Sequence, residues 1–544
     1  MEMHKYPDQE KGVYDIGTKP VEPGTITLEQ EYGTVQRGLK SRHIQFIAIG
    51  GTIGTGLFVG SGGALARAGP VSLLLGYTIV GTILLSVIQV LGEMATYLPI
   101  AGGLTVYAKR YVSDDVAFAL GVNYWFGAAI TICAEVSAAA IVIQFWTTKV
   151  NIAIWITIIL FGILALNIFS VKGYGEAEFI FASIKIVTII ALLILAFIID
   201  LGGAPNHHRL GFQYWKNPGA MKPYLKPGNA GRFLGFLSTF VYAAFAYGGS
   251  EVIAVAAAEA ENPRRNIPRA CNRVIWRILI FYLGGILAIS LTVAYNDPTL
   301  AAAIKSGAPG AGRSPFVIAI KNAEISVLPH IINAVILSSA WSSGNAFMYS
   351  SSRNLYALAL AGNVPKVFAQ VNRNGVPWVA VLATFAIALL SYLNVSNSSS
   401  VAFGWFSNLT TVSGLFNWAT LSFTYLRFRK GAILQGIHAT LPFKAWFAPY
   451  TGYWALGSCI FIILIQGFPV FFGEFAAADF VAAYIGIPIF FLPMVIYKVV
   501  KRPKLVPYNE MDFLTGKDEI DEDERNSIVP VPRNFLEKIW FAIA

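Results

Sequence analysis

The chain is poor in charged residues and in cysteine. Of its 544 residues, 13% are Asp, Glu, Lys or Arg, whereas 55% are hydrophobic; typical soluble domains are about one quarter charged. Such scarcity argues against a soluble protein and for one that is solvated by lipid. The three cysteines, Cys133, Cys271 and Cys459, lie in or beside apolar segments without paired spacing. We therefore expect packing residues and neither a disulfide framework nor a zinc site.

Several functional classes lack their usual signals as well. The first 43 residues are polar and show no charged, apolar and small-residue pattern of a cleaved signal peptide, so we expect the first membrane helix to act as the targeting signal. No metal-ligand cluster, Ser/His/Asp set or phosphate-binding loop stands out, so we expect neither an enzyme nor a cofactor. The net charge of +10 is not gathered on one face with aromatic residues between the charges, which argues against a nucleic-acid partner.

Long apolar runs dominate what is present. Each reaches the roughly 20 residues that a helix needs to cross a bilayer. They predict an all-α integral membrane protein with about 12 transmembrane helices in a domain at 44–499, between an N-terminal tail at 1–43 and a C-terminal tail at 500–544. The predicted spans are 44–66, 71–97, 117–146, 151–170, 178–199, 233–259, 274–295, 330–360, 376–394, 402–426, 453–472 and 480–499.

The basic residues indicate the orientation of the chain. They gather in alternate connecting segments, for example Lys109–Arg110, Arg264–Arg265 and Arg427–Lys430, whereas the short loops on the opposite side hold little beyond Arg67 and Lys149. Cytoplasmic loops carry an excess of Lys and Arg. Both termini are therefore predicted to be cytoplasmic, and we expect the acidic run near the C-terminus, 518–525, to be a solvated part of that tail.

Glycine-rich runs interrupt two of the spans. Gly50–Gly56 lies in the first span and Ala246–Glu251 in the sixth. The two spans correspond if the domain is a pair of five-helix repeats, at about 44–199 and 233–426, followed by two extra helices at about 453–499. Paired breaks of this kind mark the midplane site of inverted-repeat transporters. The alternative is that these glycines only allow close helix packing.

A site of this kind suits a zwitterion. The free amides and the positive dipole end of a half-helix attract a carboxylate, and the exposed carbonyls of the other break can receive an ammonium group.

Four ionisable residues lie within predicted spans: Glu93, Glu135, Lys185 and Glu251. Each costs roughly 2.5–3.5 kcal/mol at the centre of a membrane helix on insertion scales, so each is a functional candidate. Glu93 lies near the inner end of its span, where a salt bridge is an equal alternative to gating. Glu251 follows the second break, where its charge also suits a structural helix cap.

The eighth span carries a polar strip from Ser338 to Asn345, which includes Ser342. Such a strip can face a water-filled cavity that binds substrate, or it can join membrane helices through small polar side chains. Both interpretations remain open at this point.

Several ordered motifs resemble the fungal amino acid permeases of the amino acid-polyamine-organocation superfamily, from about residue 36 to 500. The motifs are GGTIGTGLFVGSGG at 50–63, LGEMATYLP at 91–99, FAYGGSEVIAVAAAEAENPRRNIPRA at 245–270, YNDPTL at 295–300, SPFVIAI at 314–320 and SSRNLYALALAGNVPKVF at 351–368. The resemblance implies an inverted-repeat fold with two additional helices, a plasma-membrane location and uptake driven by the proton gradient.

The resemblance also implies roles for individual residues. The residues expected to contact substrate, together with those of the polar strip, are Thr52, Gly54, Thr55, Gly56, Phe245, Ala246, Tyr247, Ser342 and Asn345. The first four would hold the carboxylate, carbonyls near Phe245 and Ala246 would receive the ammonium group, and Phe245 would close over the substrate. Lys185 would occupy the place of a sodium ion in sodium-driven relatives, and Glu135 would help to relay the proton.

The segments at 202–221 and 307–320 are similar to the branch that carries proline and neutral amino acids. Tyr242 stands where proline permeases tend to have a lysine, which argues against strict proline specificity. We expect an amino acid:proton symporter; the alternatives are an exchanger or facilitator without proton coupling, and a transporter-like amino acid sensor. Lysines of the N-terminal tail, Lys5, Lys11 and Lys19, are candidate acceptors for ubiquitin ligases, which commonly remove such permeases from the surface.

Overall fold

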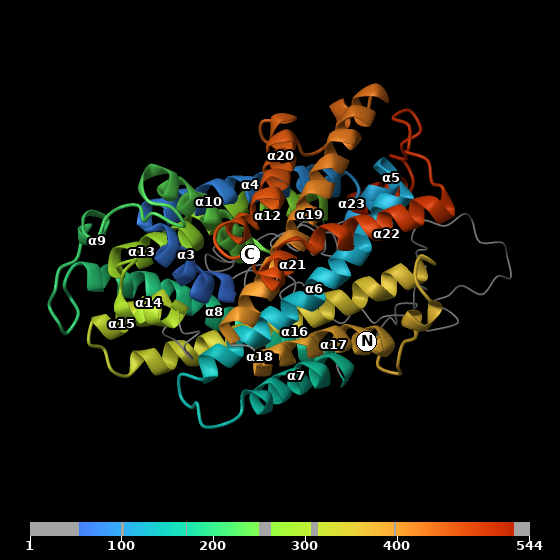
Figure 1. The fold of residues 1–544 in the computed structure, drawn as a ribbon. Helices are drawn as coiled ribbons and strands as arrows, with labels where there is room; N and C mark the ends of the chain where they lie inside the picture. The colour runs from blue at the N-terminus through green and yellow to red at the C-terminus, as the bar shows by residue number, and fades with distance from the viewer. Residues whose placement is uncertain are drawn as a thin grey trace, which may run out of the picture.

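The computed structural model describes residues 54–99, 103–169, 171–249, 263–305, 314–396 and 399–526. Within these ranges the chain forms helices and loops and no strand. The helices pack against one another as a bundle (Figure 1). Thr52, Glu251 and the N-terminal tail with its three lysines lie outside the described residues.

The described part of the first half of the chain forms four long helices and several short ones. Their bounds are η1 Gly56–Gly60, α3 Ser61–Ala68, α4 Pro70–Tyr97, α5 Gly103–Tyr111, α6 Asp114–Ile143, α7 Ile152–Phe169, α8 Val171–Asp200 and α9 Gln213–Lys216.

The second half continues with α10 Gly228–Tyr247, α12 Pro263–Arg277, η2 Ile278–Leu283, α13 Gly284–Thr292, α14 Pro298–Lys305, α15 Pro315–Asn322, α16 Leu328–Leu360, η4 Lys366–Ala369, α17 Trp378–Ala388, η5 Leu389–Tyr392, α18 Leu393–Ser396 and α19 Ser399–Leu434. The final helices are η6 His438–Thr440, α20 Tyr450–Ile465, η7 Phe468–Phe471, α21 Ala477–Tyr484, α22 Gly486–Lys501 and α23 Lys517–Asn526.

Local sequence explains where the long helices begin. Gly69, with φ of 79°, turns the chain just before Pro70 opens α4, and proline is favoured at the first helical position because its missing amide would have no partner there. Ser113 is extended just before α6, whose first turn carries Asp114 and Asp115. Acidic residues suit that end of the helix dipole.

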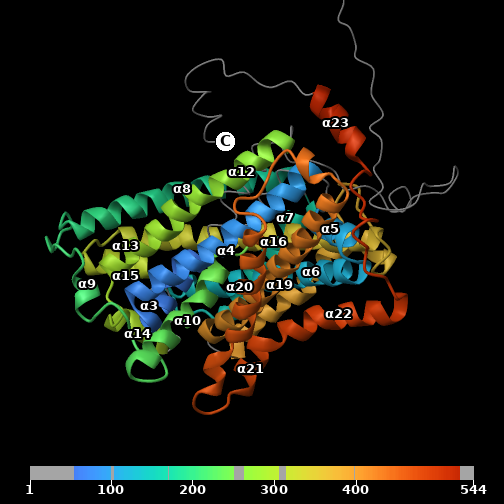
Figure 2. The same ribbon diagram turned by 90° about the horizontal axis from the view of Figure 1, so that it is seen from above.

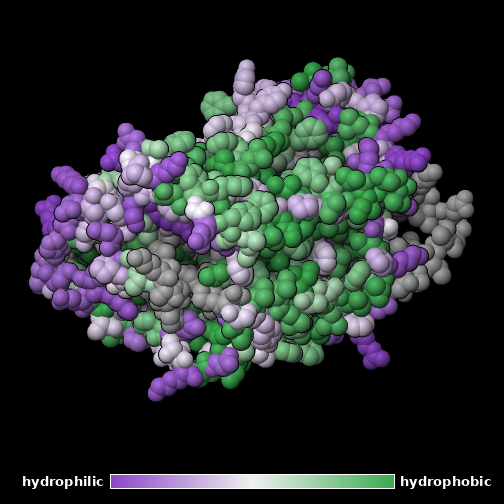
Figure 3. Space-filling view, viewed as in Figure 1, coloured by the Kyte–Doolittle hydropathy of each residue, from purple (hydrophilic) through white to green (hydrophobic). Residues whose placement is uncertain are grey.

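The bundle has the apolar surface of a membrane protein. Among the described residues, seven helices are long and apolar enough to cross a bilayer, and the pair α21 and α22, bent by 49°, forms an eighth candidate. Apolar residues form a broad band across the middle of the face in Figure 3, and hydrophilic residues gather toward its ends. The described helices follow the predicted spans closely, so the predicted all-α membrane fold is confirmed.

Helix α6 forms the centre of the bundle. Its most apolar stretch is 94% buried, compared with 28% for α7 and 33% for α8. It packs most extensively against α16 and α19, and Figure 1 shows it crossing the middle of the bundle. The lipid-facing positions therefore belong to the outer helices, and α6 is available to line an internal site.

The segment 503–526, called the C-terminal strap below, packs against the end of the bundle. The amide of Val506 donates to the carbonyl of Val112 at 2.9 Å, and the guanidinium of Arg427 donates to the carbonyl of Val506. Phe513 is 1% exposed, and its ring contacts those of Tyr111 and Phe428. Both hydrogen bonds and apolar contacts therefore hold this part of the tail against the bundle.

The acidic run of the strap differs from the predicted solvated tail. It forms α23, and Arg264 at the start of α12 lies 2.6 Å from both Asp521 and Glu524. The hydrogen bond from Lys517 holds the pKa of Asp521 below its usual range. Figure 2 shows α23 beyond the ends of α12 and α5. Two carboxylates of the run are thus paired with Arg264, which the sequence pattern alone did not reveal, whereas Asp518 and Glu522 are exposed as expected.

Candidate functional site

A small internal cavity lies where the two predicted breaks meet α6, α16 and α19. Its volume is about 70 Å³, enough for a few water molecules. The lining residues are Gly54, Gly56, Tyr124, Gly127, Ala128, Thr131, Glu135, Phe245, Ala246, Gly248, Gly249, Ser343, Phe347, Thr410, Ser413, Gly414 and Asn417. Four of the nine residues predicted to bind substrate are among them.

The first break opens the η1 segment. The amides of Leu57 and Phe58 donate to the carbonyl of Gly54 at 3.3 and 3.4 Å, so the helix starts at this glycine. The opening amides of a helix have no partner within that helix and form its positive end. Because Gly54 and Gly56 line the cavity, that positive end faces it.

The second break ends α10. The amide of Gly248 donates to the carbonyl of Phe245 at 3.1 Å, and Gly249 then takes a φ of +76°, which glycine adopts at no steric cost. The last carbonyls of a helix lack partners within it and form its negative end. The cavity therefore has a positive helix end on one wall and a negative helix end on another.

A close approach joins the two breaks. A Cβ atom at Gly56 would lie only 2.6 Å from the Cα of Ala246. Because the obstructing atom belongs to the backbone, no side-chain rotation could relieve the contact. Gly56 is therefore required for η1 to lie directly against the end of α10.

Glu135 provides the only carboxyl group on the cavity wall among the lining residues. It comes from the middle of α6 and is 4% exposed. One carboxylate oxygen lies 3.5 Å from the position of a Cβ at Gly54, where the hydroxyl of Ser343 is 3.4 Å away. The carboxyl group thus sits beside the positive helix end.

Lys185 lies behind Glu135. Its side chain is fully buried within α8, and it interacts electrostatically with Glu135 and with a second acid, Glu178. Burying an isolated charge in a membrane is costly, so buried ionisable groups in membrane proteins pair with one another. The structure thus brings together the two residues that the sequence singled out for proton coupling.

Phe245 borders the cavity from α10. Its ring meets that of Phe403 edge-on, with centroids 5.8 Å apart. The cavity is smaller than an amino acid requires in this conformation, so substrate entry requires the aromatic wall or the half-helices to move.

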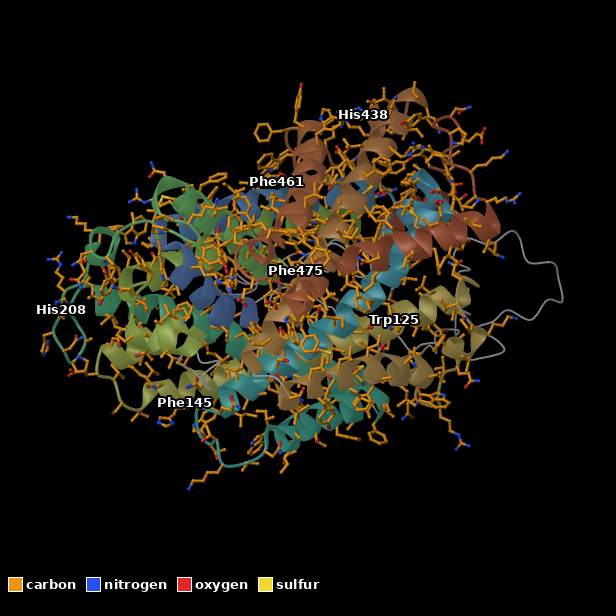
Figure 4. All side chains as sticks on the ribbon, in the orientation of Figure 1. Trp125, Phe145, His208, His438, Phe461 and Phe475 are labelled. Carbon is orange, nitrogen blue, oxygen red and sulfur yellow. The ribbon has the colours of Figure 1, made fainter. Side chains whose placement is uncertain are left out.

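A larger and more open depression, of about 400 Å³, lies elsewhere, near the C-terminal end of α6. It is lined by Phe145, Lys321, Glu324 and His330 among others, and Figure 4 shows Phe145 at the edge of the bundle. It contains neither helix break nor any of the buried charges. The smaller cavity is therefore the candidate substrate site, because a carboxyl group and the ends of two helices meet there.

Comparison with known proteins identifies the family of the chain. The family model for amino acid permeases matches residues 43–508. The chain belongs to the amino acid permease family. It is 48% identical to a proline-specific permease of Emericella nidulans over 96% of both chains, and 48% identical to a probable proline-specific permease of Schizosaccharomyces pombe over the same shares. It is also 45% identical to a proline-specific permease of Saccharomyces cerevisiae, over 92% of this chain and 82% of that one.

The permease holds several other predicted substrate residues away from the cavity. The hydroxyl of Tyr247 donates to the carbonyl of Tyr77 at 3.1 Å. Ser342 donates to Glu178 at 2.8 Å, and the side-chain oxygen of Asn345 accepts a bond of 2.6 Å from Asn167. Thr55 is fully buried beside Glu135 and does not line the cavity. In this conformation these four residues support the cavity wall and do not form its surface.

Glu93 lies in a separate polar cluster near the C-terminal end of α4. Its carboxylate accepts bonds from the hydroxyl of Tyr425 at 2.9 Å and the amide of Ala445 at 2.7 Å, and it lies 3.6 Å from Arg429. These contacts match the salt-bridge alternative for this residue. They join α4 to α19 and to the loop that follows it.

Two residues near the charged pair were not predicted. Glu178 stands seven positions before Lys185, which corresponds to two helical turns and places both on one face of α8. That spacing could have revealed it, but Glu178 is the first residue of the predicted span 178–199 and was not counted among the ionisable residues within spans. Ser343, and not the predicted Ser342, lines the cavity, because adjacent helix positions point about 100° apart.

Proposed function

We propose that this amino acid permease is a proton symporter that imports proline or other neutral amino acids across the plasma membrane. The observation that carries the proposal is the buried Lys185 and Glu135 pair directly behind a cavity with two opposite helix ends. A cavity with a positive and a negative helix end matches a zwitterion, whose two charges need no charged side chain as partner. The buried acid then remains available for a proton.

The proposed cycle follows from these positions. The substrate carboxylate binds at the start of η1, near Thr52, Gly54 and Gly56, and the ammonium group binds at the carbonyls that end α10. Glu135 takes a proton from the outside, and substrate and proton then cross together as the predicted repeats rock around the site. Release of the proton from Glu135 to the inside resets the carrier. Glu251 and Glu93 act as helix cap and inner brace in this scheme.

The character of the wall supports a neutral substrate. Apart from Glu135, the lining residues are apolar, hydroxyl or amide side chains and glycines. The names of three relatives, which describe proline-specific permeases, support proline as the first substrate to test. No lysine is among the lining residues, so we propose neutral amino acids in addition to proline. Tyr242 itself is outside the lining, with its ring against Gly63 and under the guanidinium of Arg67.

The test is uptake of labelled proline by permease-deficient yeast at acidic external pH. The other amino acids are added one at a time as competitors, and the assay is repeated with a protonophore. Concentrative uptake that the protonophore abolishes supports the symporter, and the strongest competitors define the substrate class. Equilibrative uptake that is insensitive to the protonophore would instead indicate an exchanger or facilitator. Surface expression with no uptake of any amino acid would favour a sensor.

The proposed orientation places both termini in the cytoplasm. We propose that Lys5, Lys11 and Lys19 on the N-terminal tail accept ubiquitin there. Replacing the three lysines by arginine should slow substrate-induced loss of the permease from the cell surface, measured by fluorescence microscopy of a tagged chain. Unchanged loss in the triple variant would contradict this assignment.

A further inference from the structure

Glu178 is a buried acid that the proposed transport cycle does not use. Glu178 is 0% exposed. Ser342 of α16 donates a hydrogen bond of 2.8 Å to one of its oxygens. Its carboxyl group also interacts electrostatically with Lys185 on the same helix. A buried carboxylate needs such partners, because an unpaired charge in a membrane is costly.

The geometry of α8 explains the pairing. Seven residues rise about 10.5 Å along a helix and complete nearly two full turns, so Glu178 and Lys185 lie on one face. Long side chains in helices point toward the N-terminus. From its position on α8, a lysine side chain of this kind can reach back toward Glu178.

The same face meets Glu135. Lys185 interacts electrostatically with that residue too, and Ser342, the partner of Glu178, stands next to the cavity-lining Ser343. The neighbouring helices α7 and α13 contribute no charged residue. Lys321 of α15 lines the larger depression near the C-terminal end of α6. Two carboxyl groups and one ammonium group thus form the charged cluster that the described side chains show here.

The charges of Glu135, Glu178 and Lys185 can be counted to ask how many protons these three groups hold. With all three groups ionised the net charge is −1, and a single added proton makes the cluster neutral. Because a net buried charge is disfavoured, the cluster as built has a place for one proton. If Glu178 were neutral, Lys185 and Glu135 would balance each other and no proton would be needed.

The surroundings of the two acids differ. Each acid has a hydroxyl group beside it, Ser342 at Glu178 and Thr55 at Glu135. The difference is that Glu178 is not among the residues that line the cavity. Glu135 borders the cavity and can exchange a proton with water that enters it. On the basis of the proposed symport, we infer that Glu178 is the fixed counter-ion of Lys185, a positioning residue that leaves Glu135 as the carboxyl group that gains and loses the transported proton.

The test uses purified full-length permease in proteoliposomes, with the membrane potential clamped and an inward pH gradient of two units. One pH unit corresponds to about a tenfold concentration ratio for one coupled proton, so the wild type can accumulate labelled proline up to about 100-fold. We expect Glu178→Gln to equilibrate proline to a ratio of about one while it still exchanges labelled for unlabelled proline. Glu324→Gln, which removes an acid from the larger depression near the C-terminal end of α6, is the matched control and should accumulate proline as the wild type does.

The double variant Glu178→Gln/Lys185→Met provides the decisive second measurement. It removes both members of the inferred pair and leaves Glu135 as the remaining acid of the cluster, so accumulation of at least tenfold should return, although Lys185→Met alone accumulates nothing. If Glu178→Gln does not reach the membrane, the double variant should restore both its expression and its accumulation.

Two results would overturn the inference while the symport stands: undiminished accumulation by Glu178→Gln, or failure of the double variant to regain accumulation. Absence of proton-driven accumulation in the wild type would instead overturn the proposed function itself, and this inference with it.

Discussion

The contact between Gly56 and the end of α10 allows a quantitative prediction for Gly56→Ala. The added Cβ would lie 2.6 Å from the Cα of Ala246, whereas ordinary contacts begin at 3.4 Å. The two backbones must therefore separate by about 0.8 Å. Overpacking of this kind typically costs about 1–3 kcal/mol. Because both segments line the cavity, we expect the strain to appear as weaker substrate binding, by about 5-fold to 150-fold.

The assay compares the KM for labelled proline in yeast with the Kd from a scintillation proximity measurement on the purified permease. Surface expression is followed by a fluorescent tag. Gly60→Ala is the matched control, because its Cβ would meet only the ring of Phe245 at an ordinary distance of 3.9 Å, and its affinity should stay within about twofold of the wild type. Wild-type affinity of Gly56→Ala at normal surface expression would refute the requirement for close approach.

Three further predictions concern the buried pair and the C-terminal strap. Glu135→Gln and Lys185→Ala should each abolish proline accumulation without removing the permease from the membrane; normal accumulation by both would contradict the coupling assignment. Phe513→Ala removes a ring that is 1% exposed and should cost about 3–5 kcal/mol, seen as a lower thermal unfolding temperature in detergent; an unchanged temperature would argue against tight docking of the strap. Since the pKa of Asp521 is lowered by its hydrogen bond from Lys517, its ion pairs should be fully formed above about pH 4 and be lost only as pH falls further; a spin label on α23 that is already mobile at pH 7 would contradict this.

Apolar runs and glycine pairs were sufficient to predict the main architecture. The run at 71–97 became α4 at Pro70–Tyr97, and that at 151–170 became α7 at Ile152–Phe169. The length of each run is set by the bilayer, which makes this signal strong. The break after Tyr247 could also be predicted, because two consecutive glycines within an apolar span weaken the helix at that point.

The direction in which individual side chains point from their helices could not be predicted. In α6 and α16 apolar or small residues occur on all sides, so periodicity does not separate lipid-facing from buried positions. Hence Ser342 was expected in the cavity, although it bonds to Glu178. The strap was missed for another reason. Its docking uses backbone carbonyls, such as that of Thr515, which accepts a bond of 2.9 Å from Arg110. Every residue has a backbone carbonyl, so the sequence does not indicate which carbonyls accept such bonds.

The deep burial of α6 has a consequence for how the permease is assembled. This helix is apolar enough to enter a bilayer alone, whereas α16 and α19, its two principal partners, are not among the helices that meet this condition. Since α6 precedes both along the chain, it enters the membrane surrounded by lipid and later exchanges that lipid for protein. We expect the more polar α16 and α19 to pack against α6 during membrane insertion. The small residues of α6 would then be needed for assembly of the bundle as well as for transport.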